Sequence, residues 1–144
     1  MNPIGTILLV EDNSDDVFFM RRACKSVGLQ NPLHVVEDGN KAIDYLAGNG
    51  QFADRAAFPL PCVMLLDLKL PGKSGLEVLG WIQERPEFVT SVVIVLTTSR
   101  EPRDIQEAYR LGANAYLVKP TSPTQLVEVV SSIKSFWIDH NVVQ

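Results

Sequence analysis

Five short apolar runs alternate with longer segments of mixed polarity along this chain, and this alternation limits the folds that it can adopt. The runs are rich in Val, Ile and Leu, and runs of this length are typical of buried parallel strands. Between them, apolar residues recur at helical spacing. Strands that alternate with helices predict an α/β fold, namely a doubly wound five-stranded parallel sheet with helices on both faces. The predicted strands are 6–11, 33–37, 62–67, 91–96 and 115–118.

Length and composition indicate one globular domain. The chain has 144 residues, 46% of them hydrophobic, so we expect a single domain over 1–144 with a core at about 5–139 and no output domain. No apolar stretch approaches the ~18 residues of a membrane span, and no signal peptide is evident. The net charge is −4 and no cluster of Lys or Arg forms a stripe. We therefore expect a cytoplasmic protein that binds neither nucleic acid nor membrane.

Charged residues follow three of the predicted strands. Glu11 and Asp12 follow the first, Asp67 the third and Lys119 the fifth. In the strand order 2-1-3-4-5, the first and third strands are neighbours, and functional groups gather beyond the carboxyl ends of such strands. Like charges ~4 Å apart repel by about 4 kcal/mol at an effective dielectric constant of 20. Lys119 offsets the negative charge of one carboxylate. One divalent cation is expected to offset the charge of the others, and oxygen ligands suit Mg²⁺.

These groups fit phosphoryl transfer to a carboxylate. Asp67 is the candidate nucleophile, because Glu11 and Asp12 are better placed as metal ligands. Thr97 and Thr98 come at the end of the fourth strand, where a hydroxyl and an amide can hold phosphoryl oxygens. Each feature also has a purely structural interpretation. The segment 12–16 is an ordinary helix start, and Asp67 can hydrogen-bond the turn that follows it.

Taken together, these motifs resemble the receiver domain of response regulators in two-component signalling. The resemblance covers essentially the whole chain, and the order and spacing of the motifs make it specific. Its fold is flavodoxin-like, with strand order 2-1-3-4-5. The motifs are 7–12 (ILLVED), 65–72 (LLDLKLPG) with Gly75, 95–99 (VLTTS) and 115–120 (AYLVKP).

The resemblance implies a chemical role for each site residue. Asp67 is the expected phosphoacceptor, and Mg²⁺ is bound by Asp12, by Asp67, by Glu11 partly through water, and by the backbone carbonyl of Lys69. Lys119 is expected to pair with the phosphoryl group. The chain then catalyses only its own phosphorylation and dephosphorylation and is not an enzyme with a separate substrate.

The same resemblance implies a switch. Thr97 is expected to move toward the phosphoryl group, and the Tyr116 ring turns inward as it does so. The peptide bond between Lys119 and Pro120 is expected to be cis. The readout surface is then formed by the fourth helix, the fifth strand and the fifth helix.

Two features indicate a subgroup of receivers. The long connection 48–61 and the run 96–99 resemble single-domain regulators that pair with phytochrome histidine kinases. The expected partner is therefore a sensor histidine kinase, of phytochrome type. Phe136, Trp137 and Ile138 extend past the usual end of the fifth helix. They either complete the core or, together with the readout surface, form the interface of a homodimer.

Three other functions share parts of this pattern. A phosphatase of the haloacid-dehalogenase type needs a second acid two residues after the nucleophile, where this chain has Lys69. A flavin- or nucleotide-binding module needs a phosphate-binding loop after the first strand, where this chain has the acidic segment 11–16. A scaffold that works without phosphorylation stays open from sequence alone.

Overall fold

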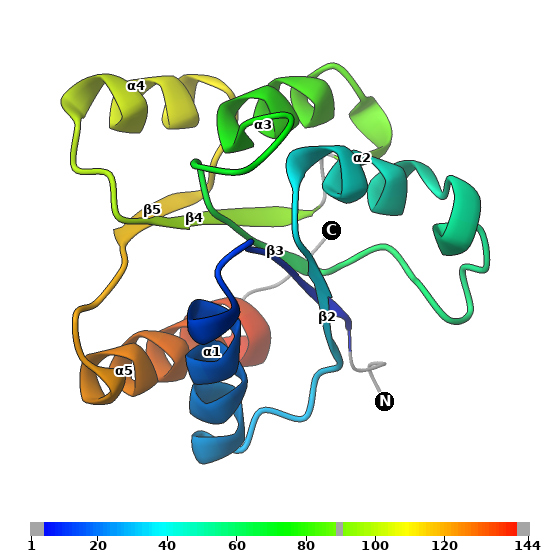
Figure 1. The fold of residues 1–144 in the computed structure, drawn as a ribbon. Helices are drawn as coiled ribbons and strands as arrows, with labels where there is room; N and C mark the ends of the chain where they lie inside the picture. The colour runs from blue at the N-terminus through cyan, green and yellow to red at the C-terminus, as the bar shows by residue number, and fades with distance from the viewer. Residues whose placement is uncertain (1–4, 89–90, 141–144) are drawn as a thin grey trace.

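The computed structural model describes residues 5–88 and 91–140, which contain a five-stranded parallel sheet (Figure 1). The strand order is β2-β1-β3-β4-β5, which confirms the predicted doubly wound sheet. Strand β1 pairs with β2 on one side and with β3 on the other, so the strand order reverses there and leaves a crevice at the carboxyl ends. The strands are β1 (Ile7–Val10), β2 (Leu33–Val36), β3 (Val63–Leu66), β4 (Val92–Thr97) and β5 (Ala115–Val118).

Helices cover both faces of this sheet. In Figure 1, α2, α3 and α4 lie on one face, and α1 and α5 lie side by side on the other. Right-handed crossovers between parallel strands produce this arrangement. The helices are α1 (Ser14–Ser26), α2 (Gly39–Ala47), α3 (Gly75–Gln83), α4 (Pro102–Arg110) and α5 (Pro123–Ile133), with short 3-10 turns at Gly50–Phe52 and Pro86–Phe88.

The apolar runs supply a core on each face, because successive strand residues point to opposite sides. In β1, Leu8 and Val10 pack in the core beneath α2, α3 and α4. Ile7 and Leu9 pack in the core beneath α1 and α5. Burying each such side chain contributes about 1.5–3 kcal/mol. A strand buried on both faces therefore has to be continuously apolar, as these runs are.

Local capping residues place the helix starts at the carboxyl edge of the sheet. The Asn13 side chain accepts a hydrogen bond from the Asp16 N–H at 3.0 Å and begins α1. The Ser122 hydroxyl accepts one from the Gln125 N–H at 3.2 Å and begins α5, with Pro123 at the first helical position. Both starts agree with the sequence, since Asn and Ser satisfy amides that have no partner inside the helix.

The connection 48–61 is ordered around Arg55. Its guanidinium donates hydrogen bonds to the carbonyl oxygens of Tyr45 at 2.7 Å and Leu46 at 2.6 Å, and so satisfies carbonyls at the end of α2. The Phe52 and Tyr45 rings lie 5.1 Å apart in the core. A 3-10 turn at Gly50–Phe52 ends on the buried Phe52.

The chain continues past α5 in a π-helical segment at Lys134–His140. Trp137 and Ile138 pack against the core beneath α1 and α5, whereas Phe136 is 60% exposed. Trp137 and Ile138 therefore complete the core, whereas the homodimer interface stays a prediction. Within 5–88 and 91–140, no helix has both the length and the hydrophobicity to cross a bilayer.

Candidate functional site

The predicted site residues meet at the carboxyl edge of the sheet. Glu11 follows β1, Asp67 follows β3, Thr97 ends β4 and Lys119 follows β5. Strands β1 and β3 pair in register, Val10 opposite Leu66, so the residues that follow them are neighbours. Glu11 and Asp67 are 3% and 6% exposed, which is unusual for carboxylates and indicates that they have partners.

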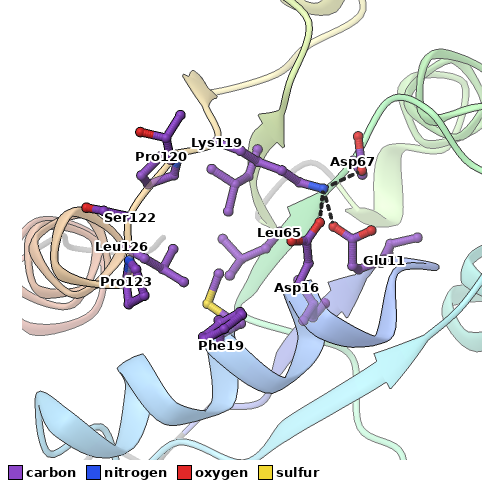
Figure 2. A pocket seen from close by; sticks show the side chains of 15 residues that line it. Glu11, Asp16, Phe19, Leu65, Asp67, Lys119, Pro120, Ser122, Pro123 and Leu126 are labelled. Atoms are coloured by element: carbon purple, nitrogen blue, oxygen red, sulfur yellow. Dashed lines mark hydrogen bonds and ion pairs between the residues drawn. The ribbon is translucent and has the colours of Figure 1, made fainter.

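Lys119 connects these carboxylates. Its Nζ lies 2.5 Å from Glu11 Oε1, 2.8 Å from Asp67 Oδ2 and 2.8 Å from Asp16 Oδ2 (Figure 2). Burial by itself lowers the pKa of Lys119, but the hydrogen bonds to the three carboxylates outweigh it and raise that pKa above its ordinary value. The lysine is therefore a fixed positive charge at the centre of the site.

Glu11 is held on its other oxygen by the backbone. Its Oε2 accepts a hydrogen bond from the Asn13 N–H at 3.1 Å. Burial raises the pKa of Glu11 above its ordinary value, and the contacts with Lys119 and Asn13 oppose that shift. Asp67 is oriented in a similar way, because its Oδ1 accepts a hydrogen bond from the Lys69 N–H at 3.2 Å.

Glu11, Asp12 and Asp67 form a candidate metal centre. One carboxylate oxygen from each lies within 4.8 Å of the others. Charges at that separation repel by about 3.5 kcal/mol per pair at an effective dielectric constant of 20, and Lys119 neutralises only one of them. An all-oxygen donor set fits a hard divalent cation such as Mg²⁺ or Mn²⁺. The residues present therefore fit the divalent ion expected from the sequence.

Thr97 supplies an unsatisfied donor at the same edge. Its side chain is fully buried, and its hydroxyl oxygen has no hydrogen-bond partner among the residues that the structure describes. A buried hydroxyl without a partner costs roughly 1–3 kcal/mol. A ligand with acceptor oxygens at this edge would satisfy it. Thr98, by contrast, is exposed.

Tyr116 lies on β5 and is linked to the β4–α4 connection. Its hydroxyl donates a hydrogen bond to the Ser99 carbonyl oxygen at 2.9 Å, and its ring packs partly against the core beneath α4. Burial raises the pKa of Tyr116. The ring is thus partly buried and tied to the β4–α4 connection, and its role as a switch stays a prediction.

One expectation is wrong and one residue was missed. The peptide bond between Lys119 and Pro120 is trans, like every peptide bond in the described residues. Trans is favoured by about 0.5–1 kcal/mol, and Lys119 reaches its partners with it. The sequence indicates for Asp16 only a place in a helix start, although in the structure it pairs with Lys119. Its place in the first turn of α1, whose start lies at the site, is the signal that identifies it.

Comparisons with known proteins agree with this geometry. The family model for the response regulator receiver domain matches residues 7–131. The response regulator Rcp1 of Synechocystis sp. is 36% identical over 138 residues, which cover 96% of this chain and 92% of Rcp1.

Two solved structures extend the comparison. The phosphorylated cyanobacterial phytochrome response regulator RcpA superposes with a TM-score of 0.91 at 34% identity, covering 98% of this chain and 99% of RcpA. The Mn²⁺-bound form of Rcp1 superposes with a TM-score of 0.87 at 34% identity, covering 97% and 99%. This chain is a member of the response regulator receiver domain family.

Proposed function

We propose that this receiver accepts a phosphoryl group on Asp67 from a sensor histidine kinase and signals through a change of its protein contacts. One observation carries the proposal: at the carboxyl edge of the sheet, Lys119 Nζ lies 2.8 Å from Asp67, and the Thr97 hydroxyl is buried without a partner in the described residues. A phosphoryl group on Asp67 adds acceptor oxygens where a cation and a donor are already in place.

The transfer follows from these positions. An Asp67 carboxylate oxygen attacks the phosphorus of a phosphohistidine, the new O–P bond forms as the P–N bond breaks, and the imidazole leaves with the bonding electron pair. Lys119 then pairs with phosphoryl oxygens, and the Thr97 hydroxyl donates to another. Glu11, Asp12, Asp67 and the Lys69 carbonyl would hold one Mg²⁺ ion, which neutralises charge on the transferring oxygens.

Two further residues complete the switch. Thr98, which is exposed just after the end of β4, would offer its backbone amide or hydroxyl to the phosphoryl group. The Tyr116 ring has two positions, inward and outward. Movement of Thr97 toward the phosphoryl group stabilises the inward position and so shifts the populations of the two. The surface formed by α4, β5 and α5 then carries the signal. The chain turns over no substrate other than its own aspartyl phosphate.

The relatives suggest the pathway. Rcp1 is a response regulator of Synechocystis sp., and RcpA is a cyanobacterial phytochrome response regulator. We infer a phytochrome-type histidine kinase as the phosphoryl donor for this chain, and the cytoplasm as the compartment where a kinase of that type presents its phosphohistidine. Transfer from such a kinase to purified protein, absent with an unrelated kinase, would support the assignment.

A mass measurement tests the chemistry without a kinase. Wild-type protein incubated with acetyl phosphate and Mg²⁺ is expected to gain one phosphoryl group, and to gain none when the divalent ion is removed by a chelator. An adduct that forms at the same rate without any divalent ion would contradict the proposed metal centre.

The acidic cluster predicts how the metal affects stability. Saturating Mg²⁺ at about 100 times its dissociation constant is expected to stabilise the wild type by about 2.7 kcal/mol, because only the folded chain assembles the site. An Asp12→Asn variant is expected to melt at a higher temperature than wild type without metal, since one repelling charge is gone, and to respond little to Mg²⁺.

The matched control for that experiment is Asp15→Asn. Asp15 is exposed on the first turn of α1 and does not belong to the cluster. Thermal melts with and without Mg²⁺ should show a wild-type response for this variant. An equal Mg²⁺ response in Asp12→Asn would remove Asp12 from the ligand set.

We also propose that two copies associate through the β5–α5 side. A groove of about 740 Å³ lies between β5 and the C-terminal helical segment, lined by Leu117, Val129, Phe136 and Trp137 among others. Strand β5 is the edge of the sheet, and Phe136 beside it is 60% exposed. An exposed phenyl ring next to an apolar groove fits a self-complementary contact in which each copy supplies both parts.

Sedimentation velocity tests the association. With beryllofluoride, a phosphoryl analogue, the wild type is expected to sediment as a dimer and Phe136→Ser as a monomer. Phe18→Ser is the control, since Phe18 is 58% exposed but lies on α1. Phe136→Ser dimerising like wild type, or Phe18→Ser losing the dimer equally, would contradict the proposed interface.

A further inference from the structure

An apolar cavity of about 290 Å³ extends from the site into the molecule between α1 and α5 (Figure 2). We call it the α1–α5 cavity. Leu9, Leu65 and Leu96 form its floor on the sheet, and Phe19 and Leu126 form walls on the two helices. Glu11, Asp16, Asp67 and Lys119 lie together at its other end. Phosphoryl transfer uses only that charged end, so the apolar part has no role in the proposed reaction.

The size of the cavity limits what it can hold. Ligand pockets usually begin at about 300 Å³ and combine an apolar lining with a few converging polar groups. A volume of 290 Å³ is that of roughly ten liquid waters. A benzene ring with a short side chain fits this volume. The leucine and phenylalanine lining favours an apolar body.

The charge at the polar end selects the head group of such a ligand. Three carboxylates line the cavity there, those of Glu11, Asp16 and Asp67, and a fourth, Asp12, lies beside them in the candidate metal centre. Lys119 is the one basic residue among the described residues that line the cavity. Lys119 and a divalent ion together supply three positive charges, so one negative charge remains. Without the ion, the excess of negative charge is larger. In both cases the negative charge favours a ligand with a cationic head group.

Asp16 is the carboxylate that is available to such a head group. Glu11, Asp12 and Asp67 form the metal centre, and Asp16 does not belong to it. Asp16 lies on the first turn of α1 and lines the cavity. Its side chain is 43% exposed, with its Oδ2 2.8 Å from Lys119 Nζ. An ammonium group at the mouth can pair with Asp16 while the rest of the ligand lies among the leucines.

We propose that the α1–α5 cavity binds small monocations with an apolar body, and that Asp16 pairs with their ammonium group. Binding forms no covalent bond and does not require phosphorylation. It is therefore measured separately from the proposed function, and either can fail while the other holds.

Methyl NMR titration of the full chain in Mg²⁺ tests the proposal with 2-phenylethylamine and its uncharged analogue 2-phenylethanol as probes. The expected result is saturable shifts of the Leu9, Leu65 and Leu126 methyl signals, with the amine binding about fivefold tighter than the alcohol, as expected for one partly exposed ion pair. Absence of saturable shifts, shifts confined to other surfaces, or equal affinity of the two probes would each overturn it.

Two matched variants locate the head group. Asp16→Asn is expected to lower the affinity for the amine to that for the alcohol and to leave the alcohol unchanged, which also shows that the cavity is intact. Asp15→Asn removes the same charge from the same turn of α1 without touching the cavity and should bind both probes like wild type. If both substitutions lowered the affinity for the amine equally, the effect would come from the net charge of this region. The specific role of Asp16 would then be overturned.

Discussion

Asp67→Asn is expected to gain no phosphoryl group from acetyl phosphate under conditions where the wild type gains one. The side chains are nearly the same size, but the amide nitrogen is not a nucleophile, and the amide carries no charge to pair with Lys119. The substitution also removes one of the three carboxylates of the candidate metal centre. The expected effect is a complete loss of the adduct, because nucleophile, ion pair and metal ligand are all lost together.

Intact-protein mass spectrometry measures this loss, and hydroxylamine supplies the chemical control. Acyl phosphates on carboxylates are cleaved by hydroxylamine, whereas phosphate esters on serine or threonine are not. The wild-type adduct should therefore disappear on treatment. An adduct on Asp67→Asn that forms at the wild-type rate, or a wild-type adduct that survives hydroxylamine, would move the acceptor to another residue.

The strand-end residues of the site could be predicted because the sheet itself places them. Glu11, Asp67 and Lys119 each follow a short apolar run, and parallel strands bring their carboxyl ends to one edge. The contact between Lys119 and Asp67 at 2.8 Å follows from that placement. Here the length and the apolar character of the runs were sufficient evidence, since the sheet topology alone brings together Lys119 and Asp67, which lie 52 positions apart in the chain.

Features that depend on rotation within an element could not be predicted in the same way. Asp16 reaches Lys119 because of the direction in which α1 leaves the strand, and that direction is set by the cap at Asn13. The hydrogen bond of the Tyr116 hydroxyl depends on a carbonyl of another connection, at Ser99. The α1–α5 cavity arises from the spacing of two helices that only tertiary packing fixes.

Close backbone approach is another feature that a single sequence does not show. Gly75 belongs to the motif after Asp67, but its spacing alone gives no reason for glycine. In the structure, a Cβ at Gly75 would lie 2.2 Å from the carbonyl oxygen of Asp67 and 2.7 Å from the Cα of Leu68. The Gly75 N–H also donates a hydrogen bond to the Leu68 carbonyl oxygen at 2.9 Å. The start of α3 is thus packed directly on the backbone of Asp67, the proposed phosphoacceptor.

Gly75→Ala is therefore expected to destabilise the fold by about 2 kcal/mol, because both atoms that the new methyl group meets belong to the backbone and cannot rotate away. The backbone at Asp67 has to move, so phosphorylation by acetyl phosphate should also slow. Gly80→Ala is the matched control. Gly80 lies in the same helix with nothing within 4 Å of its added Cβ. It should stabilise the protein by about 0.5–1 kcal/mol, since alanine favours helix over glycine.

Urea denaturation of the two variants and the wild type, followed by circular dichroism, separates these expectations. Opposite shifts of the unfolding midpoint, with the rate of phosphorylation lowered only in Gly75→Ala, would show that the close approach of α3 holds the acceptor in place. A Gly75→Ala midpoint equal to that of Gly80→Ala would mean that the backbone after Asp67 yields at little cost. The first turn of α3 would then not position the carboxylate, and Lys119 with the Lys69 N–H would be left as its main supports.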